Sequence, residues 1–355
     1  MTSNISLKAS TLTIVLGAFG GWVAFNIGAP MPFLLGSLLV TAGLTISGWS
    51  GLGFRPALPP TLRSAFVGVI GVSIGSSFSS DILQILASMW LVGLAVVGFV
   101  LIALASNYVI FRRLGKYDST TAFFAAMPGG LIESVSMGER LGADVQILTL
   151  QQISRITLVI TILPFMFLIW TGEKVGSAAG VPLGAALGEL GMFDIVLLVV
   201  AGVAGYYGGR FLRLPAYFLV GPLAASAIAH SLGWTAATPP GWTVALAQVI
   251  VGAGLGCRFS GFDPAAIFRT LWLAVISVML MLVIDAAIVA VLVNVQHQPF
   301  DVLLISLAPG GITETALIAL GLGANPVFVT TLHVFRIGLA VLFCAVGYRF
   351  LKNGK

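Results

Sequence analysis

Apolar residues fill most of the chain in long runs, and these runs recur in two successive sets. Short stretches containing Pro, Gly, Lys or Arg separate them. Such runs predict membrane-spanning helices, because about 20 apolar residues cover the hydrocarbon core of a bilayer. We expect ten spans: 11–27, 33–48, 61–79, 86–111 and 146–170 in the first set, and 193–209, 215–231, 242–257, 268–294 and 326–348 in the second.

Two further apolar stretches, 119–140 and 302–321, are each interrupted by Pro-Gly-Gly. The first carries Pro-Gly-Gly-Leu-Ile-Glu from Pro128, and the second carries Pro-Gly-Gly-Ile-Thr-Glu from Pro309. Over 128–156, ten of the 29 residues are identical in the second copy, 181 positions later. Proline removes a backbone donor and two glycines free the backbone, so each stretch is expected to form a re-entrant helical hairpin. A simple kink in a continuous helix is the alternative.

The repetition extends well beyond the interrupted stretches. Pro-x-x-Phe-Leu-x-Gly at 30–36 recurs at 215–221, and Gly-x-x-x-Gly-x-x-Phe at 71–78 recurs at 252–259. The second motif predicts close helix packing, because glycine lets two backbones approach. The expected organisation is a first repeat over 1–170, a linker over 171–192 and a second repeat over 193–355.

Positive charges predict how the two repeats are oriented. With five spans per half and a hairpin that returns to its own side, 14 Lys and Arg residues lie on one side and only Lys174 lies on the other. Cytoplasmic loops carry such an excess, so both termini are expected in the cytoplasm. Five is an odd number, so the second half enters the membrane in the opposite sense. The sequence therefore predicts an inverted repeat with about ten transmembrane helices and two hairpins.

Composition excludes a water-soluble globular domain. Of the 355 residues 58% are hydrophobic and 8% are charged, against about 25% charged in soluble domains. An all-α polytopic membrane protein is expected, with the lipid bilayer as its surroundings. The net charge of +5 forms no basic cluster interleaved with aromatic residues, so no nucleic-acid partner is expected. The sequence shows no nucleotide motif, metal-ligand spacing or catalytic nucleophile motif, so we expect no enzyme, no catalytic or metal-binding residues and no cofactor.

Glu133 and Glu314 come three residues after the second glycine of each interruption. Each could bind a coupling cation or proton, or could cap the first turn of the helix that follows, and the two roles are compatible. Further along, Asp144 and Asn325 occupy matching positions and are expected to cap the next helix.

Arg155 and Arg336 lie about ten residues into their apolar spans. An arginine there keeps its charge and must pair or face water. One interpretation is that the guanidinium groups bind an organic anion bidentately. The other is structural, with Arg155 paired to Glu133 and Arg336 paired to Glu314.

Asp285 stands alone in an apolar run, and Leu104 occupies the matching position of the first half. A lone acid in a span suits proton coupling, whereas a hydrogen bond from a neighbouring helix is the alternative. His333, three residues before Arg336, could assist proton linkage, but a packing role is favoured.

The doubled Pro-Gly-Gly-x-x-Glu, followed by Gly-Ala-(Asp/Asn) and Arg-Ile, resembles the duplicated AbrB-type bacterial membrane family, whose members are often labelled ammonia monooxygenases. The resemblance covers nearly the whole chain. It implies a polytopic protein of the bacterial inner membrane that acts as a transporter, and it brings no substrate.

The expected function is therefore ion-coupled secondary transport of a small organic anion that bears a carboxylate. The part carrying the hairpins and the fifth spans is expected to move against the remaining helices, by an elevator or a rocking motion. The alternative function is a passive channel built on paired re-entrant loops. The coupling ion is expected to be H⁺ or Na⁺. The sequence is also compatible with a homodimer. The sequence assigns substrate binding to Gly129, Gly130, Gly310, Gly311, Arg155 and Arg336, and coupling to Glu133, Glu314 and Asp285.

Overall fold

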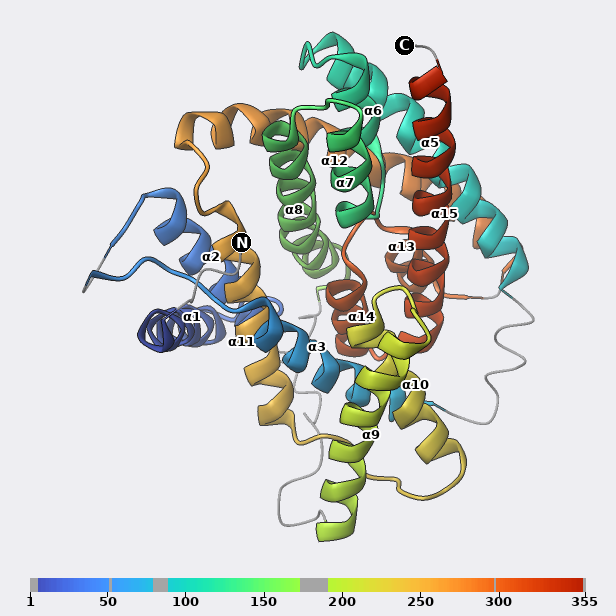
Figure 1. Ribbon diagram of the computed structural model, residues 1–355. Helices are drawn as coiled ribbons and strands as arrows, with labels where there is room; N and C mark the ends of the chain where they lie inside the picture. Colours follow the sequence, from blue (N-terminus) through green and yellow to red (C-terminus); the bar gives the residue numbers. More distant parts are fainter. Residues whose placement is uncertain (1–5, 51–52, 79–88, 173–190, 297, 354–355) are drawn as a thin grey trace. The chain divides into compact units, whose positions relative to one another are not determined.

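The protein is helical throughout the part described by this computed structural model, which leaves out residues 1–5, 51–52, 79–88, 173–190, 297 and 354–355 (Figure 1). Most of the predicted 171–192 linker lies outside the described residues. Within the described ranges there are α-helices, one short 3-10 helix and no β-strand. The helices are α1 Leu7–Asn26, α2 Pro32–Ile46, α3 Pro60–Gly75, α5 Trp90–Arg113, α6 Ser119–Ala126, α7 Leu131–Arg140, α8 Val145–Thr171, α9 Met192–Phe211, α10 Tyr217–Ser231, α11 Gly241–Gly256, η4 Cys257–Phe259, α12 Pro264–Leu292, α13 Phe300–Leu307, α14 Ile312–Gly321 and α15 Pro326–Asn353.

Each of the ten predicted spans coincides with one helix, and seven of these helices are long and apolar enough to cross a membrane. The seven are α1, α5, α8, α9, α11 continued by η4, α12 and α15. The chain is thus a multi-pass membrane protein whose described residues form helices and no strands. The other three, α2, α3 and α10, contain only 15 or 16 residues. At 1.5 Å per residue they measure about 23 Å, less than the hydrocarbon thickness of about 30 Å.

The chain divides into two compact units, and each unit contains segments of both sequence halves. Unit 1 comprises Met1–Leu83, Leu163–Gly261 and Ala316–Val327. It therefore holds α1, α2 and α3 together with the matching α9, α10 and α11. The colours of Figure 1 show the same mixture, since blue helices of the first half belong to the same unit as yellow helices of the second.

Unit 2 comprises Gln84–Ile162, Phe262–Thr315 and Phe328–Lys355. It contains both Pro-Gly-Gly interruptions and most of α8 and α15, as the sequence predicted for one part of the molecule. The second predicted hairpin is nevertheless divided, because α14 from Ala316 onward belongs to unit 1. Unit 2 also contains α5 and α12, the fourth span of each half, which the sequence analysis had assigned to the other part. α12 packs against both α5 and α13, so the fourth spans belong to the same compact body as the broken segments.

In unit 1, glycines bring helices of opposite halves into backbone contact. α3 packs on α10, and a Cβ added at Gly71 would lie 2.6 Å from the carbonyl oxygen of Leu219. α11 packs on α2 in the same way, where a Cβ at Gly252 would collide with Leu34. The two Gly-x-x-x-Gly motifs therefore serve close helix packing, as the sequence predicted.

Replacing Gly256 by alanine should destabilise unit 1. A Cβ at this position would lie 2.6 Å from the backbone nitrogen of Ala42 and would also meet Thr41 and Leu38. Overpacking against rigid backbone costs about 1–3 kcal/mol, so we expect a melting temperature in detergent that is several degrees lower. Gly43→Ala, on the facing helix α2, is the matched control because nothing lies within 4 Å of its added Cβ. Equal melting temperatures for the two variants would contradict this packing.

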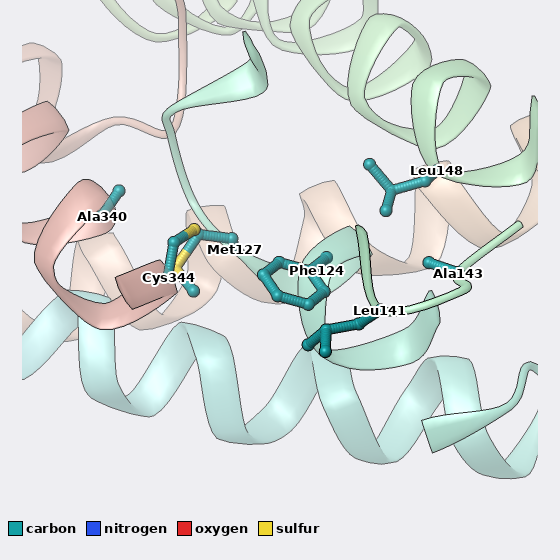
Figure 2. Packing of buried hydrophobic residues seen from close by; sticks show 7 residues of the cluster. All are labelled: Phe124, Met127, Leu141, Ala143, Leu148, Ala340 and Cys344. Carbon is teal, nitrogen blue, oxygen red and sulfur yellow. The ribbon is translucent and has the colours of Figure 1, made fainter. Parts of the chain in front are cut away.

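In unit 2, an apolar cluster joins the first broken segment to α8 and α15. α6 packs against α7. Figure 2 shows Met127 lying beside Cys344 of α15, with Phe124 next to Leu141. The remaining members are Ala143, Leu148 and Ala340, and all seven are at most 9% exposed. This packing fixes the first interruption against helices from both halves of the sequence.

Candidate functional site

Both Pro-Gly-Gly sequences interrupt their helices, so neither stretch is one continuous helix. α6 ends at Ala126 and α7 begins at Leu131. At the first interruption Gly129 has φ 139° and Gly130 has φ 61°, which side chains rarely tolerate. Glycine is therefore required there by the backbone conformation itself.

At the second interruption the glycines leave space for neighbouring side chains. α13 ends at Leu307 and α14 begins at Ile312. A Cβ at Gly310 would lie 2.7 Å from Cγ2 of Thr315 and 3.2 Å from Cγ1 of Val159 on α8. A Cβ at Gly311 would collide with the carboxylate of Glu314. The two copies of Pro-Gly-Gly thus form two breaks whose backbone conformation and packing differ.

The first interruption is held by side chains of α8. Arg155 Nη1 donates to the carbonyl oxygen of Met127. Gln152 Nε2 donates to the carbonyl oxygens of Phe124 and Ala125, at 3.1 and 3.3 Å. These carbonyls end α6 and lack partners within the helix. A cation there also complements the negative end of the helix dipole.

Arg336 of α15 makes the equivalent contacts at the second interruption. Its Nη1 donates to the carbonyl oxygens of Leu307, at 3.4 Å, and Ala308. Its Nη2 donates to the carbonyl oxygen of Gly310, at 2.6 Å. Both arginines thus bind backbone at the breaks, an arrangement that neither sequence hypothesis included. The anion-binding role remains a prediction.

Asp285 contributes a fully buried carboxyl group to unit 2. It is 0% exposed, and neither of its oxygens has a hydrogen-bond partner in the described part of the chain. The predicted hydrogen bond from a neighbouring helix is therefore not present there. Arg336 interacts electrostatically with both Asp285 and Arg155. Unit 2 thus contains two buried arginines that repel each other and one buried acid that attracts Arg336.

His333 lies one turn before Arg336 and is completely buried. Its Nδ1 lies 3.0 Å from the carbonyl oxygen of Val329, one turn earlier in α15. His333 occupies the repeat position of Gln152, so the two breaks are flanked by different polar side chains.

The glutamates fold back towards the glycines that precede them. Glu314 is 3% exposed, and its carboxylate lies against Gly311. Glu133 is partly buried, and its Oε2 would lie 3.4 Å from a Cβ at Gly130. Both are in the first turn of their helix, the position expected of a carboxylate that complements the helix dipole.

Several caps position the helices around the breaks. Asp144 Oδ1 accepts from the backbone N–H of Ile147, and Asn325 Oδ1 accepts from that of Val327, each at 3.0 Å, which confirms both predicted caps. Asp118 caps α6. Burial raises the pKa of the Asp118 carboxyl, but hydrogen bonds from the Thr121 side chain and from the N–H groups of Thr120 and Thr121 outweigh this and lower it. The cap is therefore ionised and effective at neutral pH.

The sequence analysis missed the polar face of α8. Gln152 holds the first break, and Gln151 and Ser154 are both buried beside Arg155 in the sequence. Their signal was present, since three uncharged polar residues within five positions of an apolar span are unusual. Among the described residues, no group of three or more His, Cys, Asp or Glu side chains is arranged to hold a metal ion.

Comparison with known proteins gives matches over nearly the full length. The sequence pattern of the family described as "Transition state regulatory protein AbrB" matches residues 50–352. A Bacillus subtilis (strain 168) protein, named "Uncharacterized protein YhjN", is 27% identical over 99% of this chain and 96% of its own length. An Escherichia coli (strain K12) protein, named "Putative regulator AbrB", is 26% identical over 94% of this chain and 93% of its own length.

Proposed function

The chain belongs to the AbrB family, and from this premise we propose that it is a secondary active transporter of a small organic anion that bears a carboxylate. The observation that carries the proposal is the pair of helix breaks in unit 2, each bound by a buried arginine. Many secondary transporters build their central site from such discontinuous helices. Unpaired backbone and buried charge are costly inside a bilayer and are retained where they serve a function.

An inverted repeat is supported by contacts that recur with the halves exchanged. Gly129 of the first break packs against Ala340 of α15, and Gly310 of the second packs against Val159 of α8. The repeat offset of 181 relates Gly129 to Gly310 and also Val159 to Ala340. Exchange of this kind is the arrangement that a two-fold axis between the halves produces. The charge bias and the odd number of spans per half favour an axis in the membrane plane.

Unit 1 shows the same exchange. Gly71 lies against Leu219, and its repeat counterpart Gly252 lies against Leu34, the counterpart of Leu219. We propose that unit 1 is the scaffold and that unit 2 carries the solute, in an elevator or rocking motion. The proposed setting is the bacterial inner membrane, with both termini in the cytoplasm.

Charge supports an anionic solute. The like charges of Arg155 and Arg336 repel each other, and Asp285 is the acid whose charge attracts Arg336. An anion bound near both arginines would reduce this repulsion. The two guanidinium groups bind carbonyl oxygens at the ends of α6 and α13, and α7 and α14 begin a few residues further along the chain, where helix N-termini attract anions. Asp285 is the proposed proton carrier, because its carboxyl has no hydrogen-bond partner in the described residues and lies near a cation. Glu133 and Glu314 are the other candidates, for a proton or Na⁺.

The test is transport by purified protein in proteoliposomes. A thermal-shift screen against small carboxylates, with and without sodium and across pH, first identifies a ligand, since binding stabilises the folded form. Counterflow of that labelled ligand is then measured. We expect saturable exchange. Rapid flux without saturation or counterflow would instead establish a channel, and absence of both binding and flux for every carboxylate would reject the proposal.

A further inference from the structure

We propose that Gln151 and Ser154 of α8 form a neutral hydrogen-bonding subsite for the hydroxyl group of a hydroxycarboxylate, beside the guanidinium of Arg155. The inference rests on the proposed transport of a carboxylate and adds the chemical class of the substrate. It assigns to the substrate two side chains that no motif had marked.

The first observation is that these side chains are buried without partners in the described part of the protein. Gln151 is 2% exposed and Ser154 is 0% exposed. Neither amide atom of Gln151, nor the hydroxyl of Ser154, has a hydrogen-bond partner. A buried donor or acceptor that stays unpaired is destabilising, because it loses its hydrogen bonds to water and gains none in return. A set of such groups on one helix therefore indicates a partner other than the protein itself.

The behaviour of Ser154 is unusual for its setting. Serine and threonine in apolar helices usually donate to the carbonyl one turn earlier. Thr161, two turns further along α8, does so with the carbonyl oxygen of Thr157 at 2.8 Å. Within the described residues the hydroxyl groups of Ser154 and Thr157 both lack this bond, and that of Ser154, on a fully buried side chain, keeps its donor and its acceptor capacity.

The two residues share a helix face with the charged group. Ser154 and Arg155 come three and four residues after Gln151, so both are neighbours of Gln151 on the surface of α8. Arg155 Nη1 donates to the carbonyl oxygen of Met127, whereas its Nε has no hydrogen-bond partner among the described residues. This face therefore presents one cation, one amide and one hydroxyl.

The chemistry of this face selects the ligand class. An amide and a hydroxyl each donate and accept, so together they suit a neutral group that does both, which a hydroxyl does. A second carboxylate would instead favour another cation. The matching positions of the second half are Leu332 and Phe335, which are apolar. The polar subsite therefore exists only in the first half of the repeat, and this asymmetry would fix the orientation of the bound solute.

The experiment compares carboxylates with and without a hydroxyl group. Binding to the purified full-length protein is measured for lactate against propionate, 3-hydroxybutyrate against butyrate, and malate against succinate. The wild type should prefer the hydroxylated member of at least one pair by about tenfold or more, because the analogue leaves buried polar groups unpaired. Gln151→Leu, which installs the side chain of Leu332, and Ser154→Ala should each abolish most of this preference. Thr161→Ala, whose hydroxyl is already bonded within the helix, should keep it.

Folding and binding can be separated in these variants. Removing an unpaired buried amide should leave the melting temperature of Gln151→Leu unchanged or higher, and Ser154→Ala serves alone if that variant does not fold. Carboxylates that bind with no preference for the hydroxyl, or a preference that survives both substitutions, would overturn the subsite and leave the transporter proposal standing. If none of the six carboxylates binds, the subsite falls, and the wider carboxylate screen then decides the fate of the proposed function separately.

Discussion

Arg336→Ala is expected to abolish transport and to destabilise the protein by about 3–5 kcal/mol. The substitution leaves the carbonyl oxygens of Leu307, Ala308 and Gly310 without their donor. It also leaves Asp285 buried without the cation that interacts with it. Thermal unfolding in detergent and counterflow in proteoliposomes measure the two effects.

Two controls separate charge from geometry. Arg336→Lys keeps the charge but cannot reproduce the planar group that reaches three carbonyls, so partial stability and poor transport are expected. Adding Asp285→Asn to Arg336→Ala should restore part of the stability, because it removes the uncompensated carboxylate. Wild-type melting temperature and transport in Arg336→Ala would show that these contacts have no importance.

Arg155→Ala should destabilise the protein less than Arg336→Ala. Gln152 still donates to the carbonyl oxygens of Phe124 and Ala125, and lies 3.4 Å from that of Met127. The first break therefore keeps a donor that the second loses. Equal losses of stability at the two positions would contradict this assignment of the contacts.

Asp285→Asn is expected to eliminate uphill uptake driven by a proton gradient while leaving solute exchange intact. Asparagine matches the shape of the acid but cannot take up a proton. Because Arg336 keeps its three carbonyl acceptors, the loss of the Asp285 charge should cost less stability than Arg336→Ala does. Uptake with an imposed pH gradient, compared with counterflow at equal pH, measures the difference.

The matched control lies on the same helix. Asp263 caps α12 by accepting from the N–H of Ala266 at 3.2 Å, and Asp263→Asn keeps that cap. It should therefore retain gradient-driven uptake. Asp285→Leu, which installs the residue of the matching Leu104, should behave like Asp285→Asn if it folds. Proton-driven accumulation by Asp285→Asn would assign the coupling elsewhere, to Glu133 or Glu314.

Helix positions could be predicted from the sequence because the signal is local. The predicted span 146–170 corresponds to α8, Val145–Thr171, and both interruptions occur at Pro-Gly-Gly. The caps at Asp144 and Asn325 were predictable for the same reason, since the acceptor and the helix start are neighbours in the chain. Apolar length, glycine and proline are properties of adjacent residues and need no tertiary information.

The partners of the arginines could not be predicted in the same way. A charge in an apolar span requires compensation, and the glutamates of the nearby motif were the obvious carboxylates. The structure instead uses carbonyl oxygens of Met127 and Ala308, which every residue possesses and no sequence pattern marks. The two-unit arrangement could not be predicted either. It depends on contacts between distant residues such as Gly310 and Val159, which come from different halves of the sequence and lie in the same unit.

The interleaving of the units has a consequence for biosynthesis. Unit 2 requires Phe328–Lys355, and its first break packs against Ala340. Unit 2 therefore cannot be completed before the last helix has been translated. Until then the earlier helices, including the one that carries Arg155, lack part of their packing. Release of a chain truncated after the first repeat would leave both bodies incomplete, and such a fragment is a natural target for membrane quality-control proteases.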